Sequence, residues 1–194
     1  MLRRIEKKKE KRKKILMGGV LVFLMIFSVM GIIIGRQDSQ KFEYNGYKFK
    51  TDGNFYVVEV NNELYGFSFF PTQVDYLNLS EDVVNILKTT PMFYITFNPN
   101  APNIDLMYMD IIRKDLSEKM DKIIVNGVLS ASADYALPVL TCQNATTHIP
   151  MIILNSSQET NIKTNKTCIV LNGQNTELLR LRDFLMYKVL GVIV

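Results

Sequence analysis

The strongest feature of the hydrophobic pattern is an apolar run over residues 15–35, in which Ser28 is the one polar side chain. A helix of this length rises about 31 Å, which matches the roughly 30 Å hydrocarbon core of a bilayer. Buried helices of soluble domains normally keep a polar face over such a length. The run therefore predicts a single transmembrane helix. A cleaved signal peptide is the alternative, although its apolar core is normally only about 7–15 residues long.

Beyond a short linker at residues 36–40, apolar and polar positions alternate with the period of two that is typical of strands. Residues 41–50 surround Asn45-Gly46, a strong hairpin signal. Residues 55–60 and 63–70 form a second pair around Asn61-Asn62, so the segment predicts an antiparallel meander. Its many aromatic residues are interpreted as sheet core rather than as a ligand platform. They are Phe42, Tyr44, Tyr47, Phe49, Tyr56, Tyr65, Phe67, Phe69 and Phe70.

The pattern then predicts helices at residues 81–89 and 104–120 on either side of a strand at 92–97. Asn78 or Ser80 caps the first helix, and Asn78 has capping-box spacing to Glu81. A βαβ crossover through the second helix is plausible.

Four strands are predicted farther along, at residues 122–129, 137–142, 150–155 and 167–172, with a polar exposed loop at 156–165. A final helix is expected at 176–190, with Leu178, Leu181, Leu185 and Leu190 facing inward. Its charged residues, Arg180, Arg182 and Asp183, are placed on its solvated face. Residues 41–194 thus predict one α+β domain.

The charge distribution orients the predicted membrane helix. The chain carries a net charge of +4, but residues 1–14 hold nine Lys and Arg against two Glu, and the rest is net acidic. By the positive-inside rule the tail is cytoplasmic, and residues 41–194 lie outside the cell membrane. The basic pI belongs to the tail, so no nucleic-acid-binding face is expected on the domain.

Cys142 and Cys168 are the only cysteines, and neither has a CxxC partner. An oxidising compartment would favour a disulfide between them, whereas two buried free thiols are the alternative. Four Asn-x-Ser/Thr sequons, at Asn78, Asn144, Asn155 and Asn165, are candidate glycosylation sites on the same side.

Catalytic signals are weak. His148 is the one histidine, and a Cys142/His148 dyad would need a free thiol. The carboxylates Asp105, Asp110, Asp134 and Asp183 are scattered, and no P-loop, GxGxxG or GxSxG motif occurs. No catalytic, cofactor-binding or metal residue is predicted.

Several short strings give the domain a resemblance to small, uncharacterised archaeal proteins with a single-pass membrane anchor. The strings are FYITFNP at 93–99, PVLTCQNAT at 138–146, CIVL at 168–171, and RDFLMY at 182–187 followed by Gly191. The resemblance implies a cell-surface compartment and paired cysteines, and no activity.

The function expected from the sequence is a non-enzymatic, membrane-anchored, extracytoplasmic domain that binds or assembles with a protein partner of the cell envelope. The alternative is a thiol-dependent envelope enzyme that uses Cys142 or Cys168.

Overall fold

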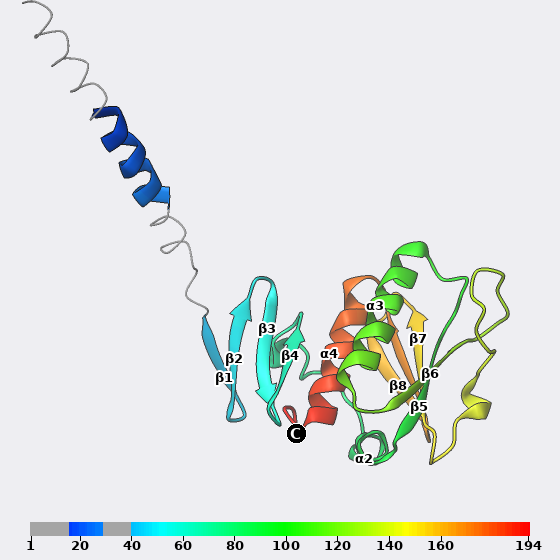
Figure 1. Cartoon of the computed structure of the whole chain (residues 1–194). Helices are drawn as coiled ribbons and strands as arrows, with labels where there is room; N and C mark the ends of the chain where they lie inside the picture. The colour runs from blue at the N-terminus through cyan, green and yellow to red at the C-terminus, as the bar shows by residue number, and fades with distance from the viewer. Residues whose placement is uncertain (1–15, 29–39) are drawn as a thin grey trace, which may run out of the picture. The chain divides into compact units, whose positions relative to one another are not determined.

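The computed structural model describes residues 16–28 and 40–194 (Figure 1). Residues 16–28 are helical and fall in one unit, Met1–Ser39, whereas Gln40–Val194 form the other. Among the described residues, no helix is both long and apolar enough to cross a membrane. The predicted tail, most of the linker, and residues 15 and 29–35 of the predicted span lie outside the described residues.

Residues 40–194 form an α+β unit in which helices lie between two sheets (Figure 1). A four-stranded antiparallel sheet has the order β1-β2-β3-β4 and a five-stranded sheet the order β6-β5-β7-β9-β8. A single hydrophobic core joins the inner face of the meander, the helices and the facing side of the larger sheet. The predicted α+β class of this domain is confirmed.

The meander consists of β1 (Lys41–Tyr44), β2 (Tyr47–Asp52), β3 (Phe55–Val60) and β4 (Glu63–Phe67). Both predicted turns are present. Asn45 and Gly46 have φ of 48° and 79°, and Asn61 and Asn62 have φ of 52° and 66°. Asparagine and glycine tolerate this left-handed backbone, which matches the twist of tight hairpins.

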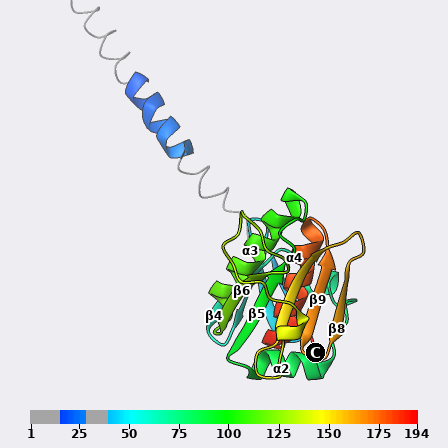
Figure 2. The ribbon, with the colours of Figure 1, turned by 90° about the vertical axis from the view of Figure 1, so that its right-hand side faces the viewer.

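The larger sheet is mainly parallel (Figure 2). β5 (Met92–Phe97) passes through α3 (Asn103–Lys119) to β6 (Ile123–Val128), which confirms the predicted crossover. β7 (Met151–Ser156) and β9 (Cys168–Gly173) continue the parallel order on the other side of β5. α2 (Glu81–Thr89) begins after Ser80, without a side-chain capping bond, so the Asn78–Glu81 capping box does not form.

Two predictions about this region are wrong. Residues 137–142 do not form a strand, because only Val139 makes a bridge, to Val128, and Cys142–Asn144 is a 3₁₀ turn. The segment 156–165 is not simply a loop, since Asn161–Asn165 forms β8, antiparallel to β9. Backbone pairing at a sheet edge does not require apolar side chains, so a polar sequence concealed this strand.

The last helix, α4 (Thr176–Leu190), lies between the two sheets and is buried on nearly all sides (Figure 1). Leu178, Leu181 and Leu185 face the core as predicted, whereas Leu190 is half-buried. The prediction that the charged residues lie on a solvated face is wrong, because Arg182 is only 3% exposed and Asp183 is 0% exposed. A helix covered from both sides has no solvated face on which to place them.

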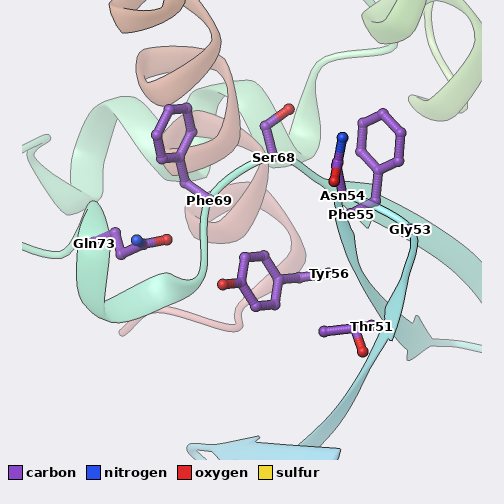
Figure 3. Close-up of a pocket in the computed structure, with 8 residues that line it drawn as sticks. All are labelled: Thr51, Gly53, Asn54, Phe55, Tyr56, Ser68, Phe69 and Gln73. Carbon is purple, nitrogen blue, oxygen red and sulfur yellow. The ribbon is translucent and has the colours of Figure 1, made fainter. Parts of the chain in front are cut away.

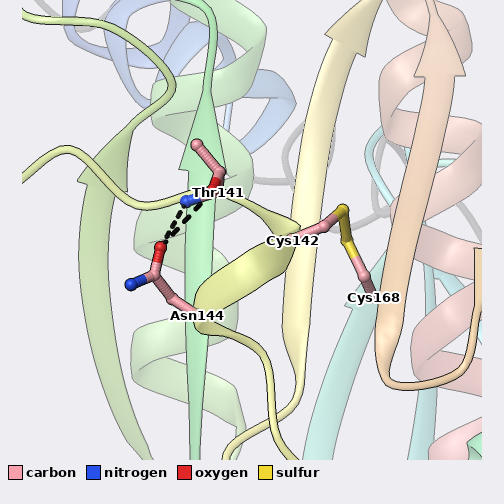
Figure 4. Close-up of a disulfide and its surroundings, with 4 residues drawn as sticks. All are labelled: Thr141, Cys142, Asn144 and Cys168. Atoms are coloured by element: carbon pink, nitrogen blue, oxygen red, sulfur yellow. Dashed lines mark hydrogen bonds between the residues drawn. A yellow bond between two sulfur atoms is a disulfide. The ribbon is translucent and has the colours of Figure 1, made fainter.

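The disulfide between Cys142 and Cys168 is present, with 5.4 Å between the two Cα atoms (Figure 4). Cys168 begins β9 and is buried, whereas Cys142 lies in the exposed 3₁₀ turn. The backbone N–H of Thr141 donates to Oδ1 of Asn144 at 2.9 Å and orders this turn. The bridge therefore joins the loop between β6 and β7 to the far face of the larger sheet.

Candidate functional site

The candidate site is a pocket of about 350 Å³ at one end of the meander (Figure 3). One side is the turn between β2 and β3, and the other is the segment that follows β4 and ends in a 3₁₀ turn, Pro71–Gln73. Its size is at the lower end of the ~300–1,000 Å³ range of small-molecule sites. The lining residues are Thr51, Gly53, Asn54, Phe55, Tyr56, Ser68, Phe69 and Gln73.

The lining is aromatic and polar, and none of its side chains carries a charge at neutral pH. Phe55 is 53% exposed at the mouth, while Tyr56 is half-buried and its ring lies between the two walls. Gly53 has φ of 58°, a conformation that glycine adopts without strain. Aromatic faces beside a few polar groups are the usual composition of a binding pocket.

Tyr56 also belongs to a cluster of aromatic rings around Phe70. The Phe70 ring centroid lies 5.1 Å from that of Phe49, 5.4 Å from Tyr56 and 5.6 Å from Phe42. Edge-on and tilted contacts at these separations are favourable for aromatic pairs. Because the cluster draws on three strands, it fixes the position of Tyr56.

The wall at Ser68 and Phe69 is held by α4. Oδ2 of Asp183 accepts hydrogen bonds from the backbone N–H groups of Ser68, at 2.8 Å, and Phe69, at 2.9 Å. The hydroxyl of Tyr187 donates to the carbonyl of Phe69 at 2.8 Å. Its ring stacks on Phe67 with 4.0 Å between centroids. One turn of a buried helix thus fixes the backbone of the pocket wall.

Arg180 of α4 packs against the same wall. Its guanidinium carbon lies 4.3 Å from the centroid of the Phe69 ring, and its NH1 donates to the carbonyl of Gln73 at 2.8 Å. Arg180 also pairs with Glu177 at 3.0 Å. Its guanidinium therefore contacts two lining residues, although Arg180 itself does not line the pocket.

Asp183 is an unusual carboxylate because it is fully buried. Burial raises its pKa to about 6, against the opposing effect of Arg182 and the two backbone N–H groups. Nε of Arg182 lies 3.0 Å from Oδ1 of Asp183 in an ionic contact that lacks hydrogen-bond geometry. NH1 of Arg182 lies 3.2 Å from Asp115. Burial likewise raises the pKa of Tyr187.

This pKa predicts a pH dependence of stability. The folded Asp183 holds a proton more tightly than an unfolded aspartate, whose pKa is near 3.8. The contribution of Asp183 to the free energy of unfolding is therefore greatest below about pH 4, and it falls as the pH rises through about 6. The change should be about 3 kcal/mol, at ~1.4 kcal/mol per pKa unit. Between pH 4.5 and 7, about 2 kcal/mol of this change should appear in chemical denaturation of the wild type and not of Asp183→Asn, because part of the loss has already occurred at pH 4.5. Equal pH profiles for the two proteins would contradict it.

The other candidate residues from the sequence do not meet at this site. Asp105 is buried beyond the ends of β7 and β9, where it accepts hydrogen bonds from the Ser156 hydroxyl and the Asn175 backbone N–H. Asp110 pairs with Arg113, and His148 and Asp134 are exposed. Within residues 16–28 and 40–194, no group of three or more His, Cys, Asp and Glu could hold a metal ion. Asp183 alone lies next to the pocket.

The sequons differ in accessibility. Asn78, Asn144 and Asn165 are exposed, as glycosylation requires. Asn155 is half-buried in β7, and its amide donates to Oδ1 of Asn172 at 2.8 Å. A glycan at Asn155 would be attached to this half-buried, hydrogen-bonded nitrogen, which is less accessible than the other three. Glycosylation of all four sites stays a prediction.

Sequence reasoning did not find the pocket. The aromatic pattern places Tyr56 and Phe69 in the sheet core, and no motif marks Thr51, Asn54 or Gln73. The one local signal was the Asp52-Gly53-Asn54 turn, which indicates an exposed loop without naming what faces it.

No protein-family model, curated protein or solved structure matches this chain. The resemblance to archaeal membrane-anchored proteins therefore stays a prediction.

Proposed function

We propose that the chain is a single-pass membrane protein whose residues 41–194 form a non-enzymatic binding domain outside the cytoplasm. The anchor is assigned to residues 15–35 and the cytoplasmic tail to residues 1–14. The apolar run and the basic tail support this topology. The disulfide agrees with it, because such bridges persist mainly in oxidising compartments. The ligand would belong to the cell envelope, and a protein partner there fits the same architecture.

The observation that carries the binding function is the composition of the pocket. It presents exposed aromatic surface and neutral amide and hydroxyl groups on a backbone fixed by Asp183 and Tyr187. A fixed site binds with less loss of conformational entropy than a mobile one. General acid–base catalysis needs groups whose pKa lies near the working pH, and neutral amides and hydroxyls do not supply them. The pocket is therefore suited to binding.

The second candidate, a thiol-dependent envelope enzyme, would need a thiolate at Cys142 or Cys168. Both sulfur atoms are joined in the disulfide, so neither is a nucleophile in this state. This candidate requires prior reduction of the bridge.

The topology gives a direct prediction. In intact cells that express the chain with a different epitope at each end, added protease should remove the epitope beyond residue 194 and spare the one before residue 1. The reason is that the basic flank keeps the tail inside. The measurement is immunoblotting before and after permeabilisation, with a cytoplasmic protein as the control for cell integrity.

Protection of both epitopes in intact cells would refute the proposed topology. N-terminal sequencing of the mature protein tests the anchor separately. A mature N-terminus between residues 29 and 40 would show a cleaved signal peptide instead.

A further inference from the structure

We propose that the pocket lined by Phe55, Tyr56 and Phe69 binds a neutral carbohydrate. The proposal rests on the binding function proposed above and names the class of ligand. It follows from the shape of the pocket, from the absence of charge among its lining residues, and from its hydrogen-bonding groups.

The first step concerns charge. An ionised ligand that enters a pocket loses hydration and needs a counter-charge in return. The lining residues offer none. The two nearby charges already have partners, since Asp183 accepts from the Ser68 and Phe69 backbone and Arg180 is held by Glu177 and the Gln73 carbonyl. Phosphates, carboxylates and amines are therefore disfavoured, and a neutral ligand is favoured.

The second step concerns the aromatic side chains. Phe55 keeps 53% of its surface exposed at the mouth of the pocket, although such rings are usually buried. Tyr56 lies between the walls with its hydroxyl directed toward Gln73 (Figure 3). A sugar ring has an apolar face of C–H groups that packs on an aromatic face through dispersion and weak C–H contacts. Phe55 and Tyr56 are successive residues of β3, so their side chains project to opposite sides of the strand. The Tyr56 ring supplies such a face between the walls, and the Phe55 ring supplies a separate one at the rim.

The third step concerns the polar groups. Within the described part of the chain, the Asn54 amide and the Ser68 hydroxyl make no side-chain hydrogen bond, and Gln73 uses only its Oε1, which accepts from the Phe70 N–H at 2.8 Å. Donors and acceptors are thus both free: the Asn54 amide, the Ser68 hydroxyl and the Gln73 Nε2. Sugar hydroxyls also donate and accept, so these groups match the rim of a sugar ring.

A second hollow, on the outer face of the meander, gives the contrast. It has a volume of about 460 Å³ and is lined by Lys48, Lys50 and Glu59 beside Val57 and Leu64. Its charged side chains belong to a solvated sheet face, and Leu64 is 72% exposed there. It is larger, but its lining is charged and contains neither Phe55 nor Tyr56. Leu64 therefore serves as a matched control for an exposed apolar side chain.

The test uses the full chain, purified in a polyoxyethylene detergent that has no sugar headgroup. Saturation-transfer NMR would be recorded with neutral trisaccharides of glucose, mannose, galactose and N-acetylglucosamine, and with glucuronic acid and glucosamine as charged controls. At least one neutral trisaccharide should receive saturation at its ring protons, with a Kd of about 1 mM or below. Neither charged control should compete with it.

Phe55→Ala and Asn54→Ala should each weaken that binding by about tenfold, as expected for residues that contact the ligand directly. Leu64→Ala should change it by less than about twofold, because surface contacts away from a site rarely couple to it. Thermal unfolding of each variant verifies that the fold is intact. Both exchanged residues are exposed, so the variants should fold.

Failure of all neutral trisaccharides to bind, or an equal loss in Leu64→Ala, overturns the carbohydrate proposal. The binding function is judged separately, with a photo-crosslinking residue at position 54 and a control at position 64 in cells. A crosslinked envelope component at position 54 alone retains the binding function with another ligand class. Absence of crosslinking at position 54 overturns the binding function as well.

Discussion

Replacement of Asp183 by Ala is expected to lower the free energy of unfolding by about 3–5 kcal/mol, the usual effect of removing one partner from a buried charged network. The change leaves the backbone N–H groups of Ser68 and Phe69 without their acceptor in a buried position. It also leaves Arg182, which is 3% exposed, with Asp115 as its remaining ionic contact. Chemical denaturation at pH 7 measures the loss.

Asp183→Asn is the matched control for this prediction. Its amide oxygen still accepts from one or both N–H groups, and the buried negative charge is removed. Because burial raises the pKa of Asp183, the charged form is the costly one, and the expected loss is below about 1.5 kcal/mol. If Asp183→Asn lowers the free energy of unfolding as much as Asp183→Ala does, the wall is stabilised by the ionic contact with Arg182. The hydrogen bonds that Asp183 accepts from Ser68 and Phe69 would then matter little.

The second large effect concerns the disulfide. Removal of the bridge by Cys142→Ala should lower stability by about 3.5 kcal/mol, the chain-entropy estimate for the 26-residue separation of the two cysteines. The double variant Cys142→Ala/Cys168→Ala should lose about the same amount, because the pair acts as a unit. Chemical denaturation of the oxidised proteins measures both losses.

The positions of the two sulfur atoms add a further expectation. Cys168 is 2% exposed and Cys142 is exposed, so Cys168→Ser should cost about 1–2 kcal/mol more than Cys142→Ser through its buried hydroxyl. Alkylation of the denatured, unreduced protein provides the independent check. Labelling at both cysteines before reductant is added would refute the bridge and restore the thiol-enzyme alternative.

The elements that the sequence predicted well are those determined by near neighbours. Asn45-Gly46 and Asn61-Asn62 specify their turns by backbone preference alone. The helix at Glu81–Thr89 combines acidic residues in its first turn with a Pro two residues beyond its end. Such signals operate before any tertiary contact forms, which is why the observed bounds agree with the predicted ones.

The burial of Arg182 and Asp183 could not be predicted in the same way. A helix with one apolar stripe is normally covered on one side only, and its charges are then solvated. Here the meander covers the opposite side, and this depends on contacts between residues more than a hundred positions apart. The walls of the pocket are nearer in sequence, because β3–β4 pairing sets Tyr56 opposite Phe67, but the bonds from Asp183 and Tyr187 that fix the Ser68–Phe69 backbone are of the same long-range kind. No local spacing relates Asp183 and Tyr187 to that segment.

The position of α4 has a consequence for the order in which the domain folds during synthesis. The meander occupies residues 41–67, but the helix that completes its core lies at residues 176–190. Until that helix leaves the ribosome, the apolar faces of both sheets lack their common partner. Contacts of such long sequence separation form slowly because loop closure precedes the gain from packing. During most of its translation the growing chain therefore exposes the apolar face of the meander. Chaperones that bind exposed apolar strands would bind the chain at this stage.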